Sequence, residues 1–343
     1  LNIDWNQSPP LLIGTPTQAG IFTVAYHDIC DNSYWHCYLN PSFTITIVSA
    51  SQTITFNNPG AQNFGTTPTL AAAATSGLAV SFTSATPGVC TITSGGLLTF
   101  VTAGTCTINA NQAGNGSYAA APQVQQSFTV NAVVPGAPTI GTATAGNAQA
   151  TVTFTAPASN GGASITGYTV TASPGGATGT GVSSPITVAG LTNGTAYTFT
   201  VTATNSAGTG SASSPSNSVT PAATQTITFN NPGAQNFGTT PTLAAAATSG
   251  LAVSFTSATP GVCTITSGGL LTFVTAGTCT INANQAGNGS YAAAPQVQQS
   301  FTVNAVVPGA PTIGTATAGN AQATVTFTAP ASNGGASITG YTV

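Results

Sequence analysis

The chain has 343 residues with no lysine or arginine, and its only acidic side chains are three aspartates. Because an average globular protein is about one-quarter charged, this composition excludes the cationic surfaces that bind nucleic acids or anionic membranes and the carboxylate clusters that bind calcium. The aspartates and both histidines lie within the first 36 residues. General acid–base catalysis needs titratable groups, so we predict that the protein is not an enzyme and has no cofactor.

The apolar residues follow the two-residue period of β-strands. Segments 53–56, 150–154 and 197–201 place them at every second position, which is typical of half-buried strands. Glycine, proline and asparagine interrupt such runs about every ten residues, as in antiparallel sandwiches. We therefore predict an all-β protein, with 71–74 as strand or loop. No stretch reaches the roughly 20 apolar residues of a membrane-spanning helix, so we expect no membrane span.

An exact internal repeat organises the chain. Residues 52–170 and 225–343 are identical, at an offset of 173 residues. The second copy of the unit is shorter than the first, and the sequence contains no methionine. We therefore expect the sequence to be a window on a longer tandem array.

The first part of the chain, residues 9–49, resembles the end of a cadherin-like immunoglobulin domain. The resemblance is carried by 14–20 and 43–47, and it implies that only the last strands of that domain are present. An insertion at 27–37 departs from the family and concentrates histidine, aspartate, cysteine, tryptophan and tyrosine.

Three interpretations of this insertion are open. We favour a hairpin tip closed by a disulfide between Cys30 and Cys37. A metal site is disfavoured, because the histidine spacing fits no zinc pattern and oxidised cysteines bind no metal, so we predict no metal. The third interpretation is a ligand-binding loop, formed by Asp31, Tyr34, Trp35 and His36. The aromatic rings of such a loop would stack on a sugar or a protein partner.

The next segment, 52–132, and its copy 225–305 resemble a bacterial immunoglobulin-like domain of the kind found in tandem on surface proteins and adhesins. The resemblance rests on 84–92, 104–110 and 126–130.

Each copy of this segment contains two cysteines at the same spacing, Cys90 with Cys106 and Cys263 with Cys279. Even, local and repeated spacing predicts disulfides, and we expect a hairpin to place the two cysteine-bearing strands side by side. Closing a loop of about 15 residues contributes roughly 3 kcal/mol in the chain-entropy model. Disulfides indicate an oxidising, extracytoplasmic compartment, which favours an extracellular or cell-surface location.

Residues 137–222 resemble a bacterial fibronectin type III domain. The most specific segment is 191–205, in which Leu191 and Tyr197 match the tyrosine corner. In that motif the tyrosine hydroxyl bonds back to the backbone and fixes a crossover between sheets. Phe154 stands where the family usually has tryptophan.

The last segment, 309–343, repeats only the first three strands of this domain and has no counterpart of Tyr197. Three strands leave an apolar face and a sheet edge open. We expect either that the chain continues or that strands from another subunit complete the domain.

Four Asn-X-Ser/Thr sequences are candidate glycosylation sites. They are a weak signal in a chain this rich in asparagine, serine and threonine. Their asparagines are Asn6, Asn115, Asn193 and Asn288.

Together these patterns predict a beads-on-a-string array of antiparallel immunoglobulin-like β-sandwiches. The predicted domains are the C-terminal part of an immunoglobulin-like domain (1–50), an immunoglobulin-like repeat (51–132), a fibronectin type III domain (133–222), an identical immunoglobulin-like repeat (223–305) and the first strands of a second fibronectin type III domain (306–343).

We expect a structural protein that forms a stalk or filament on a microbial cell surface. Nearly uncharged surfaces favour lateral association, so the expected partners are other copies or neighbouring subunits. Two alternatives are open: an adhesin or carbohydrate-binding region that recognises glycans, and a spacer of a secreted polysaccharide-degrading enzyme.

Overall fold

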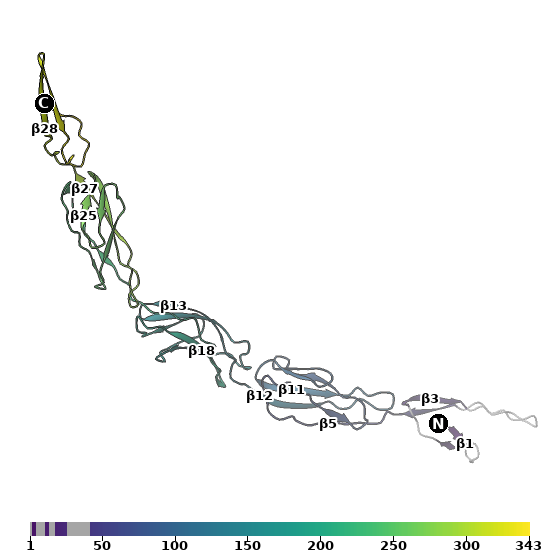
Figure 1. The fold of residues 1–343 in the computed structure, drawn as a ribbon. Helices are drawn as coiled ribbons and strands as arrows, with labels where there is room; N and C mark the ends of the chain where they lie inside the picture. Colours follow the sequence, from purple (N-terminus) through teal and green to yellow (C-terminus); the bar gives the residue numbers. More distant parts are fainter. Residues whose placement is uncertain (1, 5–10, 14–17, 26–41) are drawn as a thin grey trace, which may run out of the picture. The chain divides into compact units, whose positions relative to one another are not determined.

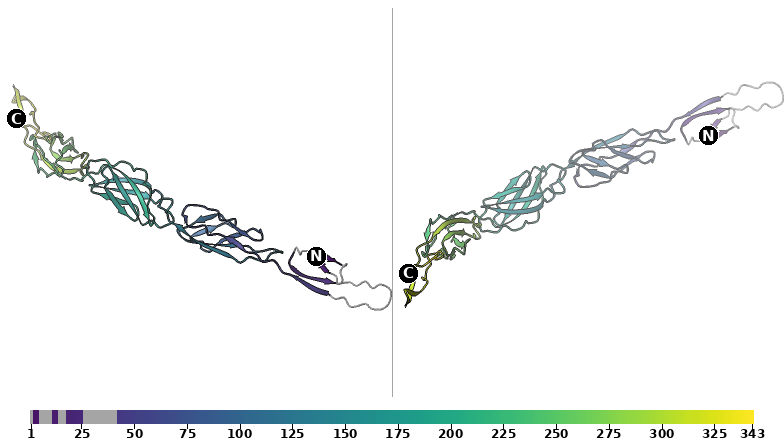
Figure 2. Two further views of the ribbon diagram at one scale, coloured as in Figure 1. Left: turned by 90° about the horizontal axis from the view of Figure 1, so that it is seen from below. Right: turned by 90° about the horizontal axis from the view of Figure 1, so that it is seen from above.

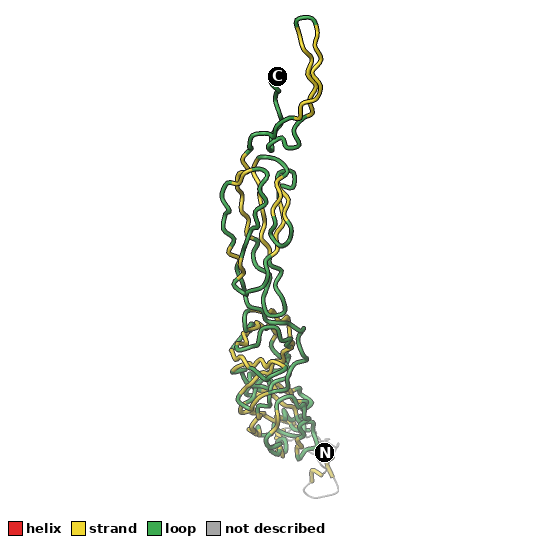
Figure 3. The backbone as a smooth tube through the Cα atoms, turned by 60° about the vertical axis from the view of Figure 1, so that its left-hand side comes forward, coloured by secondary structure: helices red, strands yellow, loops and turns green. Residues whose placement is uncertain are grey.

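The computed structural model describes residues 2–4, 11–13, 18–25 and 42–343. Every regular element in these residues is a β-strand (Figure 3), and this confirms the predicted all-β fold. No helix capable of crossing a membrane is present in this part of the chain. The internal contacts define two compact units, one of 1–138, 156–168 and 202–212 and the other of 139–155, 169–201 and 213–343.

The first part of the chain forms two strand pairs. β1 (Asn2–Asp4) pairs with β2 (Leu11–Ile13), and β3 (Gly20–Ala25) pairs antiparallel with β4 (Ser42–Ile47). The insertion between β3 and β4 lies outside the described residues, and with it the Cys30–Cys37 pair and the candidate ligand residues 31–36.

The first disulfide sandwich, the name used here for β5 to β12, has a four-stranded sheet in the order β6-β12-β11-β8 and two strand pairs, β5–β7 and β9–β10 (Figure 1). β6 runs parallel to β12, and the other pairs are antiparallel. Its strands are β5 (Ile54–Phe56), β6 (Gln62–Asn63), β7 (Ala72–Ala74), β8 (Ser81–Ser84), β9 (Cys90–Ile92), β10 (Leu98–Phe100), β11 (Gly104–Asn111) and β12 (Val124–Asn131).

Alternation of side chains along these strands builds the core. On β11, Cys106, Ile108 and Ala110 are fully buried, whereas the residues between them are partly exposed. The core also takes residues from the two strand pairs, so both layers contribute to it. The alanine run forms β7, because Ala72 to Ala74 pair with β5 and do not continue as a helix.

The second disulfide sandwich, β20 to β27, repeats this arrangement with the same sheet order and an equivalent core. Each long strand pair has the register of the first copy, displaced by the repeat offset. Its strands are β20 (Ile227–Thr228), β21 (Gln235–Asn236), β22 (Ala246–Ala247), β23 (Ser254–Ser257), β24 (Cys263–Ile265), β25 (Leu271–Phe273), β26 (Gly277–Asn284) and β27 (Val297–Asn304).

The middle sandwich, β13 to β19, has a three-stranded sheet β13-β14-β17 and a four-stranded sheet β16-β15-β18-β19 (Figure 2). Alternate residues on β14 and β18 are buried, among them Val152, Phe199 and Val201. Its strands are β13 (Thr139–Gly146), β14 (Gln149–Thr155), β15 (Gly167–Ser173), β16 (Thr178–Gly181), β17 (Ile186–Ala189), β18 (Thr198–Asn205) and β19 (Gly208–Thr209).

The last two strands, β28 (Thr312–Gly319) and β29 (Gln322–Thr328), form an isolated hairpin (Figure 3). The prediction of a third strand here is wrong, because residues 329–343 contain no strand. In the middle sandwich the same sequence forms β15, which lies between β16 and β18. Among the described residues, β28 and β29 pair only with each other.

Candidate functional site

The sites that can be identified in the described residues are structural. They contain no group of three or more histidine, cysteine, aspartate or glutamate side chains that could hold a metal ion. Every buried side-chain nitrogen or oxygen in this part of the chain has a hydrogen-bond partner. The site residues to consider are therefore the disulfides, the tyrosine corner, the joints between sandwiches and the glycosylation sequences.

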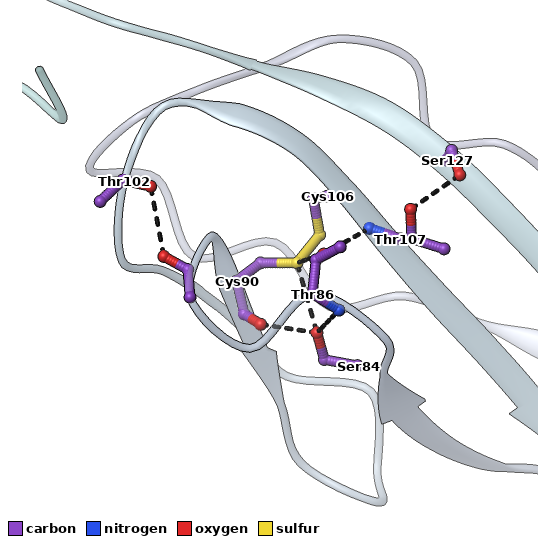
Figure 4. The surroundings of a disulfide bond; sticks show 8 residues. Ser84, Thr86, Cys90, Thr102, Cys106, Thr107 and Ser127 are labelled. Atoms are coloured by element: carbon purple, nitrogen blue, oxygen red, sulfur yellow. Dashed lines mark hydrogen bonds between the residues drawn. A yellow bond between two sulfur atoms is a disulfide. The ribbon is translucent and has the colours of Figure 1, made fainter.

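The Cys90–Cys106 disulfide joins two sheets of the first disulfide sandwich (Figure 4). The expectation that a hairpin sets these cysteines side by side is wrong. Cys90 on β9 pairs across the strands with Phe100, and Cys106 on β11 pairs with Phe128. The segment between the cysteines contains a complete strand, β10, which takes the place beside β9, so the sulfur bond crosses between the layers.

Aromatic contacts reinforce this crossing. The rings of Phe100 and Phe128 meet edge to face with centroids 6.4 Å apart, a geometry that favours aromatic attraction. Each disulfide partner therefore has a ring beside it in its own sheet, and those rings also contact each other across the core. The second copy has the same arrangement, with Cys263–Cys279 and a ring contact between Phe273 and Phe301.

Hydroxyl groups surround the disulfide (Figure 4). Ser84 donates to the Cys90 carbonyl oxygen over 2.7 Å, and the Thr86 hydroxyl accepts the Thr107 N–H over 2.9 Å. Both cysteines are completely buried, which shields the bond from solvent thiols. These bonds fix the loop before β9 against β11, so the disulfide sits in a preformed frame.

The tyrosine corner residues lie together in the middle sandwich. Leu191 and Tyr197 are both buried. The Tyr197 hydroxyl accepts a hydrogen bond of 3.1 Å from the Thr192 N–H. This bond closes the loop between β17 and β18 at the point where the chain crosses from one sheet to the other.

The joint after the first disulfide sandwich is held by loops of the middle sandwich that belong to the same compact unit. The Val133 N–H donates to the Gly161 carbonyl over 2.9 Å, and the Ala103 N–H donates to the Gly162 carbonyl over 2.8 Å. Asn205, which is 4% exposed, donates from Nδ2 to the Val133 carbonyl over 2.8 Å. The connecting segment is held again at Gly136, whose N–H donates to the Ser159 carbonyl over 2.9 Å.

Glycine at position 162 is required by a close approach. Its φ of 82° lies in the left-handed region, which favours glycine. A Cβ atom there would lie 2.6 Å from the Phe64 ring. The second copy has the same approach of Gly335 to Phe237, and the Ala276 N–H donates to the Gly335 carbonyl over 2.8 Å.

The segment before each disulfide sandwich is bound in the same way in both copies. The Ala50 N–H donates to the Ser117 carbonyl over 2.8 Å, and the Ala223 N–H donates to the Ser290 carbonyl over 2.8 Å. Buried Gln52 follows, and its amide nitrogen Nε2 donates to the Ala119 carbonyl over 2.7 Å. One loop of each sandwich thus receives the preceding chain through backbone bonds.

The glycosylation sequences fall into different environments. Asn115 and Asn288 are exposed, and the Oδ1 atom of each accepts the backbone N–H groups of the residues two and three positions further along the chain. Asn193 is half-buried, accepts the Ala148 N–H and donates from Nδ2 to Asn147 over 2.9 Å. A glycan replaces one of the two Nδ2 hydrogens, so a modified Asn193 could keep this bond only through the other hydrogen. Asn6 lies outside the described residues.

The sequence analysis missed the structural roles of three amide side chains. They are the clamp at Asn205, the buried anchor at Gln52 and a backbone clasp at Asn217, whose side chain bonds both the N–H and the carbonyl of Ala143. Their only signal in the sequence is an amide residue in an uncharged chain, which does not distinguish them from the many exposed amides.

Comparisons with known proteins agree with the middle sandwich. Residues 134–219 match the family of the fibronectin type III domain. No curated protein sequence matches the chain.

Solved structures similar to the chain include three consecutive domains of titin, at 18% identity over 59% of this chain and 74% of that one, with a TM-score of 0.27. Others are the first three fibronectin domains of chicken contactin, at 14% identity over 52% and 71%, with a TM-score of 0.25, and repeats EC22–24 of mouse cadherin-23, at 14% identity over 75% and 99%, with a TM-score of 0.29.

Proposed function

We propose that the chain is part of a non-catalytic extracellular stalk or filament on a microbial cell surface, in which the sandwiches act as spacers. The observation that carries the proposal is the repetition of the same joint contacts in both copies. Val133 and Val306 donate to the carbonyls of Gly161 and Gly334, each over 2.9 Å. Flexible linkers of free domains have no such fixed partners.

A second support is the alternation of unlike sandwiches. Identical neighbouring domains exchange strands and misassemble. The matched fibronectin type III segment stands between the two identical disulfide sandwiches. This order keeps identical partners apart while the stalk is lengthened by repetition.

The extracellular location rests on the disulfides. Such bonds persist in oxidising compartments and are rare in the cytosol. Both described pairs are buried in the cores of the disulfide sandwiches. A small domain buries a smaller fraction of its chain's surface than a large one, so covalent closure adds to its stability.

Self-association is proposed from the absence of charge. Residues 42–343 contain no ionisable side chain other than tyrosine and paired cysteine, so copies do not repel one another. Raising the ionic strength from about 10 mM to 1 M should leave association unchanged or strengthen it slightly. Dissociation at high salt would contradict contacts built on apolar and hydrogen-bonding surfaces.

The test of the whole proposal is electron microscopy of the native material, combined with thiol titration before and after denaturation. We expect stalks or filaments at the cell surface and no reactive thiol at positions 90, 106, 263 and 279. A cytoplasmic protein with reduced cysteines, or a monodisperse monomer at micromolar concentration without glycans, would contradict it. An adhesin function would depend on the loop that contains Trp35 or on sequence outside these 343 residues, and no observation on the described residues favours it.

A further inference from the structure

Asparagine is followed directly by glycine at several places in the chain. In this pair the main-chain nitrogen of the glycine can attack the asparagine amide, because glycine has no Cβ to obstruct it. The asparagines of these pairs are Asn115, Asn160, Asn193, Asn288 and Asn333. Since the pair is the same at every place, the surroundings of the glycine N–H decide which asparagines react.

Three of these pairs, called the protected pairs below, contain Gly161, Gly194 and Gly334. Gly161 and Gly334 are buried, and each donates its N–H to a serine hydroxyl over 3.2 Å. Gly194 donates its N–H to the Pro221 carbonyl over 2.9 Å. All three glycines have φ between 71° and 86°, in the left-handed region that favours glycine. Each nitrogen must lose a hydrogen bond before it can attack.

The exposed pairs, Asn115-Gly116 and Asn288-Gly289, are different. All four residues are exposed, and neither glycine N–H makes a hydrogen bond within the described part of the chain. Neither glycine has a positive φ, and a Cβ atom on Gly289 would meet nothing within 4 Å. The backbone therefore does not require glycine here, and its nitrogen is free to react.

The Asn115 amide is oriented for this attack. Its Oδ1 atom accepts the N–H groups of Ser117 over 2.8 Å and Tyr118 over 3.0 Å. In the second copy, Oδ1 of Asn288 accepts the two equivalent N–H groups over 2.9 Å and 3.0 Å. Attack on Cγ places negative charge on Oδ1, where two hydrogen-bond donors already stabilise it.

We propose that Asn115 and Asn288 are sites of spontaneous deamidation. Hydroxide removes the proton of the Gly116 N–H, and the nitrogen forms a bond to Cγ of Asn115. The bond from Cγ to Nδ2 then breaks, and Nδ2 takes a proton from water and leaves as ammonia. The remaining group is a succinimide ring. The same steps apply to the second copy.

Water opens this ring at one of two bonds. Cleavage between the ring nitrogen and Cγ gives aspartate at position 115. Cleavage between the nitrogen and the main-chain carbonyl carbon gives isoaspartate, in which the chain continues through Cγ. The net reaction consumes water and releases ammonia, so it needs no enzyme, oxidant or other reagent.

The exposed pairs lie in the loops that receive the preceding chain. The Ala50 N–H donates to the Ser117 carbonyl over 2.8 Å, and the Ala119 N–H donates to the Ala50 carbonyl over 2.9 Å. Isoaspartate adds a carbon to the main chain and makes the former Oδ1 a main-chain oxygen, so it disrupts the turn that presents Ser117. Aspartate introduces a charge into residues 42–343, which contain no charged side chain. Deamidation therefore weakens or charges this connection as the protein ages.

The same two asparagines belong to Asn-X-Ser sequences. A glycan is attached at Nδ2, the atom that deamidation removes. The two modifications therefore exclude each other at Asn115 and Asn288, and the reaction is to be measured on a chain without glycans.

Peptide mapping by mass spectrometry tests the proposal on the full glycan-free chain, incubated in the folded state at mildly alkaline pH. Digestion with pepsin suits this chain, because it needs no lysine or arginine and its acid pH stops the reaction. We expect conversion at the exposed pairs to be at least about tenfold faster than at the protected pairs. This factor corresponds to about 1.4 kcal/mol for the hydrogen bond that a protected glycine must break.

Two controls separate the structure from the sequence. In denaturant all the Asn-Gly pairs should convert at similar rates, because their hydrogen bonds are gone. The double variant Gly116→Ala and Gly289→Ala should keep the turns and convert severalfold more slowly, since each new methyl group obstructs the attack. Peptides of the two copies are identical, so the variants Asn115→Gln and Asn288→Gln report on each copy separately.

Three results would overturn the proposal. They are equal conversion at exposed and protected pairs in the folded chain, no conversion at the exposed pairs while the denatured chain reacts, and conversion that the glycine variants do not slow. Hydrogen exchange at the amides of Ala50 and Ala223 provides a second readout. Both amides should exchange faster in the deamidated chain than in the fresh chain, and unchanged exchange would reject the effect on the connection.

Discussion

The hairpins β13–β14 and β28–β29 have the same sequence in different surroundings. They share the same strand register, including the shift between Ile140 and Ala143 and between Ile313 and Ala316. Ala148 and Ala321 at their turns share a φ of 53°. Burial is the main difference, because every residue of β28 is exposed whereas Ala143 on β13 is buried.

This comparison separates local from tertiary specification. Cross-strand pairs and the turn define the hairpin without a facing sheet. Residues 340–343 are irregular, whereas the same four residues begin β15 at 167–170, where β16 and β18 lie on either side. The hairpin is therefore determined by its own sequence, whereas the sandwich also requires the second sheet.

The largest expected effect comes from removing a large side chain at the same position of both hairpins. Phe154→Ala should lower the free energy of unfolding of the middle sandwich by about 3–4 kcal/mol, because it leaves a cavity in a packed core. Phe327→Ala should change stability by less than about 1 kcal/mol, since Phe327 is 39% exposed, against 7% for Phe154, and its one ring contact in the described part of the chain is with Tyr341.

Hydrogen exchange at the amides of β14, β17 and β29, measured at increasing denaturant concentration, would separate the unfolding of the middle sandwich from that of the β28–β29 hairpin. A signal averaged over the whole chain would mix the two transitions. Each variant is the matched control of the other. Equal losses for the two variants would show that the β28–β29 face is covered in solution.

The disulfide sandwiches are the converse case, in which identical sequences have equivalent surroundings. Replacing Cys90 and Cys106 by alanine should lower the free energy of unfolding of that sandwich by roughly 3 kcal/mol, because the unfolded chain regains the entropy of an open loop. The same change at Cys263 and Cys279 should cost the same amount. Chemical denaturation of both double variants checks this equality.

A difference of more than about 1 kcal/mol between the two double variants would contradict the equivalence. The remaining disulfide provides an internal reference in each variant. The middle sandwich should melt unchanged in both, because neither disulfide lies within it.

Much of the fold could be predicted from the sequence because it depends on local pattern. Alternation located β14 and β18, and repeated cysteine spacing located both disulfides of the copies. Which sheet each cysteine belongs to could not be predicted. β9 pairs with β10, where Phe100 lies opposite Cys90, and the spacing of the cysteines does not indicate this pairing.

The Asn217 clasp is a smaller difference between the two hairpins. Asn217→Ala should lower the free energy of unfolding of the middle sandwich by about 1 kcal/mol, because two hydrogen bonds to Ala143 are lost and water can replace them at a partly exposed site. Hydrogen exchange at the Ala143 amide should accelerate, and exchange at Ala316 should not change.

An unaltered rate of hydrogen exchange at the Ala143 amide would show that the strand pairing of β13 with β14, and not the bonds to Asn217, protects this amide. The clasp itself could not be predicted, because Asn217 and Ala143 are far apart in the sequence and asparagine is common throughout the chain. The roles of Asn205 and Gln52, which bind the segments that connect the sandwiches, could not be predicted for the same reason. Their roles depend on which backbone groups the tertiary fold leaves without a partner.

The smallest expected effect is that of pH, because the stability of neither hairpin should depend on it. Stability depends on pH only where the folded and unfolded chains bind different numbers of protons. Residues 42–343 contain no aspartate, glutamate, histidine, lysine or arginine. The melting temperatures of all three sandwiches should therefore stay within about 2 °C between pH 3 and 8, measured by calorimetry.

The variant Asn217→Asp tests whether the melting temperature is independent of pH because titratable side chains are absent from residues 42–343. A protonated carboxyl can both donate to the Ala143 carbonyl and accept its N–H, as Asn217 does, whereas a carboxylate can only accept. The folded state should therefore raise the pKa of this carboxyl above its ordinary value of about 3.9. The added stability is then fully present below that value and is lost as pH rises through the folded pKa. Asn217→Asp should melt higher at pH 3 than at pH 7, while the unaltered chain does not. A shift of several degrees in the unaltered chain would reveal a bound ion or an unrecognised titrating group.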